Sequence, residues 1–117
     1  MIWIRIAGVF GFLGVALGAF GAHALQGHLS PTHIQIYHTA VLYHLLHTMA
    51  LLGYGIISRD LKRVRRWPGI CFAAGIIIFS GSLYLLALTG ISWLGAITPI
   101  GGLLLLGGWI GIATLDL

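Results

Sequence analysis

Six histidines carry the richest side-chain chemistry of this sequence, and all lie in its first half: His23, His28, His33, His38, His44 and His47. Spacings of four and three residues place several of them on one face of a helix. The members of this polar stripe are His33, Tyr37, Ala40, His44, His47, Leu51 and Tyr54. Imidazole binds Zn, Cu or Fe and titrates near neutral pH, so the stripe is the candidate site.

Three interpretations of the histidines stay open from the residues alone. In the first, neutral histidines form hydrogen bonds that hold helices together. In the second, His44 and His47 at i,i+3 share a metal ion or a haem, with His23 or His33 as a third ligand. The sequence has no HExxH, no CxxC and no carboxylate near them to orient a ligand histidine. In the third, the cluster carries protons or small solutes, without the aid of any nearby Asp or Glu.

Catalysis has little support in the sequence. The only acids, Asp60 and Asp116, lie outside the uncharged stretches, which argues against a Ser-His-Asp arrangement. Cys71 is the only cysteine and cannot form an intrachain disulfide. No phosphate-binding or dinucleotide-binding glycine motif is present. We expect no catalytic residues and no cofactor; the metal candidates are His23, His44 and His47, and a metal ion or haem is the alternative.

The elements that position these histidines belong in a membrane. Charged residues make up 7% of the 117 residues and apolar residues 59%, whereas a soluble domain carries about 25% charged residues. A chain this short has too little interior to bury so much apolar surface from water. The composition therefore predicts an integral membrane protein and excludes soluble and disordered classes.

Two long stretches, Ile6 to Ser58 and Trp67 to Leu115, contain no Asp, Glu, Lys or Arg. Each is long enough for two spans of about 20 residues. Turn signals divide them, with Ser30-Pro31 as a helix start and Gly90 as a helix end. We predict an all-α, single-domain four-helix bundle over residues 1–117, built from two helical hairpins. The expected helices are Ile4–Leu25, Pro31–Ser58, Pro68–Thr89 and Trp93–Leu115.

Five of the six cations lie in residues 59–66. The positive-inside rule places that loop in the cytoplasm, and both termini with it, in a multi-pass protein of the cell (inner) membrane. The loop serves as a topology signal or binds anionic lipid. Six cations are too few to favour nucleic acid as a partner.

Glycines and one proline predict how the helices pack. Gly11, Gly14, Gly18 and Gly21 form a stripe on the first helix, and Gly107 and Gly111 form a GxxxG pair on the fourth. Small residues allow close helix approach in lipid, either within one bundle, which we favour, or between copies. Pro99 either kinks the fourth helix or marks its true start after Thr98.

Four segments carry a resemblance to a known family. They are Gly18-Ala19-Phe20-Gly21-Ala22-His23-Ala24-Leu25, the run Tyr43-His44-Leu45-Leu46-His47-Thr48-Met49-Ala50-Leu51-Leu52, then Phe79-Ser80-Gly81-Ser82-Leu83-Tyr84, and Gly95-Ala96-Ile97-Thr98-Pro99-Ile100-Gly101-Gly102 followed by Gly108-Trp109. In this order they resemble the YgdD/YwdK-like family of small membrane proteins, a domain-of-unknown-function family with relatives among small animal transmembrane proteins.

The resemblance implies a four-helix inner-membrane protein and brings no activity, substrate or cofactor. Residues that match its motifs are His23, His47, Ser80, Gly81, Tyr84, Thr98, Pro99 and Gly101. His23 and His47 match better than the other histidines, which favours a two-histidine pair over a multi-histidine metal site. We expect a non-catalytic structural or accessory component in the lipid bilayer, as a homo-oligomer or in a larger membrane complex. The alternative is metal or haem binding, or transport of protons or small solutes, through the histidine cluster.

Overall fold

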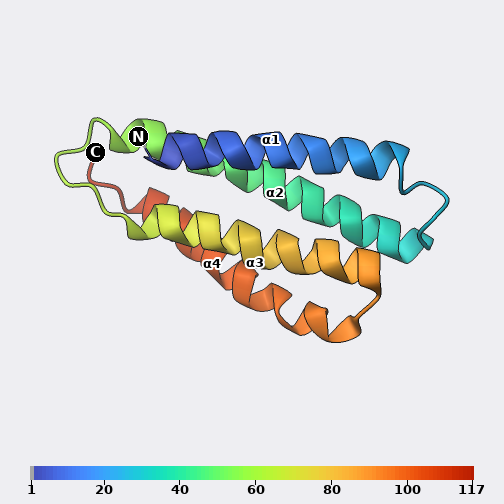
Figure 1. Ribbon diagram of the computed structural model, residues 1–117. Helices are drawn as coiled ribbons and strands as arrows, with labels where there is room; N and C mark the ends of the chain where they lie inside the picture. The colour runs from blue at the N-terminus through green and yellow to red at the C-terminus, as the bar shows by residue number, and fades with distance from the viewer. Residues whose placement is uncertain (1) are drawn as a thin grey trace.

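The chain folds entirely into helices (Figure 1). The computed structural model describes residues 2–117, and over that range it contains α1 (Ile2–His23), α2 (Pro31–Ser58), α3 (Trp67–Thr89), the short 3₁₀-helix η1 (Ser92–Ala96) and α4 (Thr98–Ala113). Four segments are long and apolar enough to cross a membrane: α1, α2, α3, and η1 together with α4. The predicted all-α membrane fold with two hairpins is confirmed.

Local sequence signals explain where the central helices begin and end. The Ser30 hydroxyl accepts a hydrogen bond from the backbone N–H of His33 at 3.2 Å, and Pro31 fills the first position of α2, where an N–H would lack a partner anyway. At the end of α3, Gly90 adopts φ 72°, a left-handed conformation that glycine tolerates without steric cost. Both predicted turns are therefore confirmed.

The first and fourth helices differ from their expected ranges, and α3 begins one residue early, at Trp67 instead of Pro68. α1 spans Ile2–His23 instead of residues 4–25, and the turn that follows contains Gly27 at φ 83°. α4 spans Thr98–Ala113 instead of residues 93–115. Pro99 lies in its first turn and marks a start, because proline cannot accept the geometry of a helix interior without breaking a backbone hydrogen bond. The preceding residues wind as η1.

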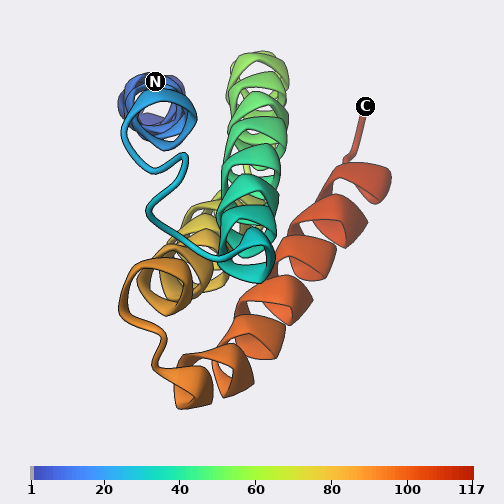
Figure 2. The same cartoon turned by 90° about the vertical axis from the view of Figure 1, so that its right-hand side faces the viewer.

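The helices pack in chain order, α1 on α2, α2 on α3 and α3 on α4. Viewed from the end, α1 and α4 lie far apart on either side of α2 and α3 (Figure 2). α2 and α4 make few close backbone contacts with each other. The side chains with the largest fully buried volume, Tyr37, Tyr54 and Phe72, come from α2 and α3. These two central helices therefore carry the core.

Glycines make these close contacts possible. A Cβ added to Gly14 or Gly21 of α1 would lie 2.4 Å from Leu45 or 2.3 Å from Tyr37 of α2. On α4, a Cβ at Gly101 would lie 2.3 Å from the backbone nitrogen of Phe79, and Gly108 and Gly111 are similarly crowded by α3. The predicted use of the glycine stripe for packing within one chain is confirmed.

Candidate functional site

The buried polar stripe runs along α2. The residues Tyr37, Ala40, His44, His47, Leu51 and Tyr54 are all buried, as their helical spacing predicted. His38 is off the stripe and exposed. Because α2 lies between α1 and α3, side chains on this face can reach both neighbours.

His44 joins three helices. Its Nε2 lies 2.8 Å from the carbonyl oxygen of Phe10 on α1, and its Nδ1 lies 2.8 Å from the hydroxyl of Tyr84 on α3. The side chain is 5% exposed, so these bonds form away from water. The Thr48 hydroxyl donates to the His44 carbonyl at 2.7 Å, a local bond along α2. His44 is therefore fixed by partners on both sides.

His47 connects α2 to α4. Its Nδ1 lies 2.8 Å from the carbonyl oxygen of Tyr43, one turn earlier, and its Nε2 accepts the indole N–H of Trp109 at 3.1 Å. The Tyr43 ring stacks on the imidazole, with 5.7 Å between ring centroids and 16° between planes. Phe72 and Trp109 complete an aromatic surround. The His47–Trp109 hydrogen bond thus joins two helices that make few close backbone contacts.

The partners assign the protons of both imidazoles. A carbonyl only accepts, so His44 carries a proton on Nε2, and a neutral His44 then accepts from the Tyr84 hydroxyl at Nδ1. The indole N–H of Trp109 only donates, so His47 carries its proton on Nδ1. The indole donor thus makes His47 neutral, and a neutral His44 has the opposite tautomer. Neutral imidazole is the form that costs least inside a bilayer.

Other hydroxyls on the central helices also bridge between elements. Ser80 of α3 donates to the carbonyl of Ala40 at 2.8 Å. Ser82 and Thr98 share a hydrogen bond of 2.6 Å between α3 and α4, and the Tyr37 hydroxyl donates to the carbonyl of Leu17 on α1. No buried side-chain nitrogen or oxygen among the described residues lacks a partner. These bonds match the first interpretation of the polar residues, interhelical hydrogen bonding.

The remaining histidines lie toward the opposite end from the basic loop. His23 ends α1 and is exposed, and His28 is exposed in the following turn, where its Nδ1 lies 3.3 Å from the Gln26 carbonyl. His33 is half-buried in the first turn of α2 and approaches Gly90. Thus only two of the six histidines belong to the buried site.

The structure does not bring His23, His44 and His47 together. Gly21 of α1 packs on Tyr37, and His47 lies ten residues further along α2, about 15 Å away at 1.5 Å per residue. Within residues 2–117, no three His, Cys, Asp or Glu side chains form a group that could hold a metal ion. Both ring nitrogens of His44 and of His47 already have protein partners. Metal or haem binding at these candidates stays a prediction that this geometry does not favour.

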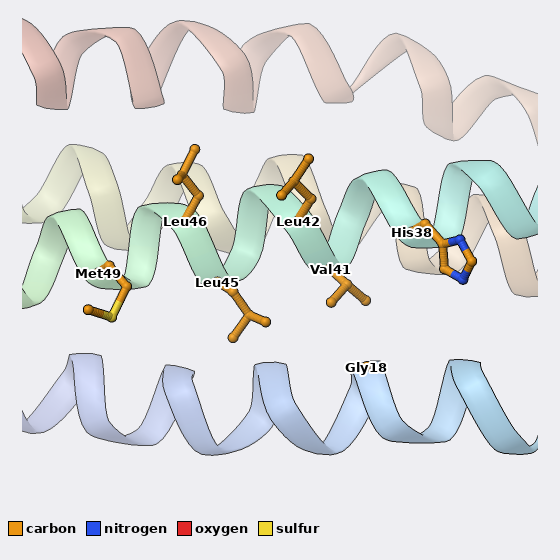
Figure 3. A pocket seen from close by; sticks show the side chains of 7 residues that line it. All are labelled: Gly18, His38, Val41, Leu42, Leu45, Leu46 and Met49. Atoms are coloured by element: carbon orange, nitrogen blue, oxygen red, sulfur yellow. The ribbon is translucent and has the colours of Figure 1, made fainter.

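Two clefts flank α2 on one face of the molecule. The α1–α2 cleft, about 470 Å³, is lined by Gly18, His38, Val41, Leu42, Leu45, Leu46 and Met49. Val41 and Leu45 point from α2 toward α1, whereas Leu42 and Leu46 point the other way, to the side of α4 (Figure 3). The α2–α4 cleft, about 490 Å³, is lined by Tyr43, His47, Phe79, Pro99, Gly102, Leu103, Leu105, Leu106 and Trp109. The His47–Trp109 bond therefore borders an apolar cleft.

Sequence reasoning found both buried histidines but not their partners. Tyr84 and Trp109 belong to the family motifs, yet helical spacing within α2 says nothing about which residues of α3 and α4 reach the same depth. Asp60 and Asp116 line a separate cleft formed by the basic loop and the C-terminus. Cys71 is half-buried in α3 and unpaired.

Comparison with known proteins places the chain among small membrane proteins. The family described as Protein of unknown function (DUF423) matches residues 17–102. A UPF0382 membrane protein of Staphylococcus aureus is 45% identical over 109 residues, covering 93% of this chain and 89% of the relative. The UPF0382 membrane protein YwdK of Bacillus subtilis is 41% identical over 113 residues, covering 95% and 92%. No solved structure matches at a significant level. The chain therefore belongs to the DUF423 family of membrane proteins, which includes YwdK.

Proposed function

We propose that this protein is a non-catalytic structural or accessory component of a membrane complex, in which it packs against a second copy or another membrane protein. The observation that carries the proposal is that the buried polar side chains all have hydrogen-bond partners among the described residues, while one face of α2 exposes large apolar side chains. All four ring nitrogens of His44 and His47 form hydrogen bonds within or between helices, which suits these side chains to hold helices in place.

The open face supplies the contact surface in this proposal. On α2, Leu42, Leu46 and Met49 are 62%, 54% and 65% exposed, and all three line the α1–α2 cleft. Tyr43 is exposed beside the α2–α4 cleft, near the middle of α2. A phenol at that depth faces lipid tails that offer no hydrogen bond, whereas a neighbouring protein can offer one.

The charge distribution supports a cell-membrane location with the basic loop in the cytoplasm. Both termini and residues 59–66 lie at one end of the molecule (Figure 1). Every Lys, Arg, Asp and Glu lies at this end: Arg5 is near the N-terminus, Asp116 is near the C-terminus, and the others belong to residues 59–66. Cytoplasmic loops are the ones enriched in Lys and Arg.

Site-specific photo-crosslinking in cells tests the proposed contact face. A photoreactive benzophenone residue replaces Leu46, which lines the α1–α2 cleft, and a matched control replaces Ile77, which is 60% exposed on α3 and lines neither cleft. We expect a discrete protein adduct from position 46 and little from position 77, with mass spectrometry to separate a second copy from a different partner. Absence of protein adducts from position 46, together with a monomer in mild detergent, would contradict the proposal.

Metal analysis and a visible absorption spectrum of the detergent-purified protein separate this role from the ligand-binding alternative. We expect neither stoichiometric metal nor a haem band, because the ring nitrogens of His44 and His47 are engaged by carbonyl, hydroxyl and indole partners. A stoichiometric metal that is lost when either histidine is replaced would refute the structural role and support metal binding.

A further inference from the structure

The charged end of the molecule contains a cleft that the structural role does not use. It measures about 450 Å³ and is lined by Ile2, Trp3, Ser58, Arg59, Val64 and Arg66. Two arginines thus share a cleft whose lining has no Asp or Glu. We propose that this cleft binds the headgroup of an anionic phospholipid, with the two guanidinium groups on the phosphate.

The other charges at this end have different surroundings. Lys62 and Arg63 line a neighbouring cleft together with Asp60 and Asp116, so acids and bases are mixed there. The Arg65 guanidinium donates to the Thr114 carbonyl and lies 5.8 Å from the centre of the Trp67 ring. Arg65 therefore ties the loop to the end of α4. The positive charge of the acid-free cleft comes from Arg59 and Arg66.

The wall of the cleft is held by packing. The Trp3 ring lies edge-on to Tyr54 at 6.2 Å, and it sits so close to Gly69 that an added Cβ would come within 2.5 Å. The Tyr54 hydroxyl in turn donates to the Arg65 carbonyl in the basic loop. Trp3 thus packs α1 against α2 and α3 beside the cleft that Arg59 and Arg66 line. Tryptophan is common at the level of lipid headgroups.

The guanidinium donors and the apolar rim of the cleft together fit a phospholipid. A guanidinium binds phosphate through two parallel N–H bonds, and two guanidinium groups more than neutralise the single negative charge of a phospholipid phosphodiester. Arg66 directly precedes α3, and no side chain caps the first N–H groups of that helix. At the rim, Ile2 and Val64 are 63% and 51% exposed, and they offer apolar surface beside the cations for an acyl chain. Inorganic phosphate uses only the cationic part.

Native mass spectrometry of the protein in a neutral detergent tests the site, with phosphatidylglycerol as the titrated probe. Phosphatidylcholine and inorganic phosphate form parallel arms. The variant R59Q/R66Q removes two cations from the acid-free cleft, and the control K62Q/R63Q removes the same charge from the neighbouring cleft. At about 1 kcal/mol per cation, we expect R59Q/R66Q to bind phosphatidylglycerol roughly 30-fold more weakly and the control to lose less than about threefold.

Circular dichroism verifies that the variants keep their helices, which is expected because both arginine side chains are exposed. If R59Q/R66Q loses helix, R59K/R66K keeps both charges but removes the forked donors, and it should bind at least about threefold more weakly than the wild type. Equal losses in R59Q/R66Q and K62Q/R63Q would overturn the proposal in favour of diffuse attraction. Phosphatidylcholine binding as tightly as phosphatidylglycerol, full displacement by inorganic phosphate, or unchanged binding by R59K/R66K would also overturn it.

Discussion

The three-helix contact of His44 makes a quantitative prediction about stability. Replacing His44 by leucine keeps the side-chain volume roughly but removes the bonds to the Phe10 carbonyl and the Tyr84 hydroxyl, each 2.8 Å long. Hydrogen bonds between membrane helices contribute about 0.6 kcal/mol on average and at most about 1.7 kcal/mol. Two of them give a destabilisation of roughly 1–3 kcal/mol for His44→Leu.

A double-mutant cycle isolates the part that belongs to Tyr84. His44→Leu leaves the half-buried Tyr84 phenol without its partner, and Tyr84→Phe removes that phenol, so the double variant should be less destabilised than the sum of the two single variants. Only one of the two His44 bonds involves Tyr84, so we expect a coupling energy of about 1 kcal/mol. The matched control is His38→Leu on the exposed side of α2, with an expected change below about 0.5 kcal/mol.

Unfolding in mixed micelles, followed by circular dichroism and tryptophan fluorescence, measures these free energies. The reasoning is refuted if His44→Leu costs no more than His38→Leu. It is also refuted if the effects of His44→Leu and Tyr84→Phe are strictly additive, because the hydrogen bond between these two side chains would then contribute nothing.

Three further predictions follow from the packing, the tautomers and the charges. Nitrogen-15 NMR should find His44 protonated at Nε2 and His47 at Nδ1, and the same tautomer in both would contradict the assigned bonds. Gly101→Ala should destabilise by about 1–3 kcal/mol, since its Cβ would press on the α3 backbone, whereas Gly81→Ala meets nothing within 4 Å and should be neutral or stabilising in the same unfolding assay. A cysteine at Lys62, in a chain whose Cys71 is replaced by alanine, should react with impermeant maleimide only after the membrane is opened, and labelling of intact cells would refute the cytoplasmic loop.

The sequence predicted the helices well because charge and hydropathy act over whole spans. A bilayer excludes charges from about 20 consecutive residues, so uncharged stretches and the turns at Ser30 and Gly90 located four helices without tertiary information. Helix ends depend on single residues, so α1 and α4 end at other residues than the uncharged stretches predict. Pro99 was recognised as a break, but the winding of residues 92–96 as a 3₁₀-helix depends on contacts with α3 that no local pattern encodes.

The candidate site was predictable on one helix and not between helices. A period of 3.6 residues sorted His44 and His47 to the buried face of α2 and His38 away from it. The pairing of His47 with Trp109 depends on how far α4 slides along α3, which glycines such as Gly101 and Gly108 set through close contact. The positions of small residues on one helix predict a contact, but the register of the contact also depends on the surface of the neighbouring helix. His23, a candidate third ligand beside His44 and His47, ends α1, and its distance from them depends on how α1 packs on α2.

The opposite tautomers explain why two adjacent histidines serve different connections in a membrane interior that has no carboxylate. His44 has its donor turned to α1 and its acceptor to α3, so it strengthens contacts that close packing already makes. His47 uses its donor on its own helix, which leaves one acceptor for the indole N–H of Trp109 across the α2–α4 cleft. Since α2 and α4 make few close backbone contacts, that bond is a direct polar link between the two walls of the cleft. A partner that occupies the α2–α4 cleft would therefore contact a lining that His47 and Trp109 hold together. The α1–α2 contact is held instead by close glycine packing and by His44.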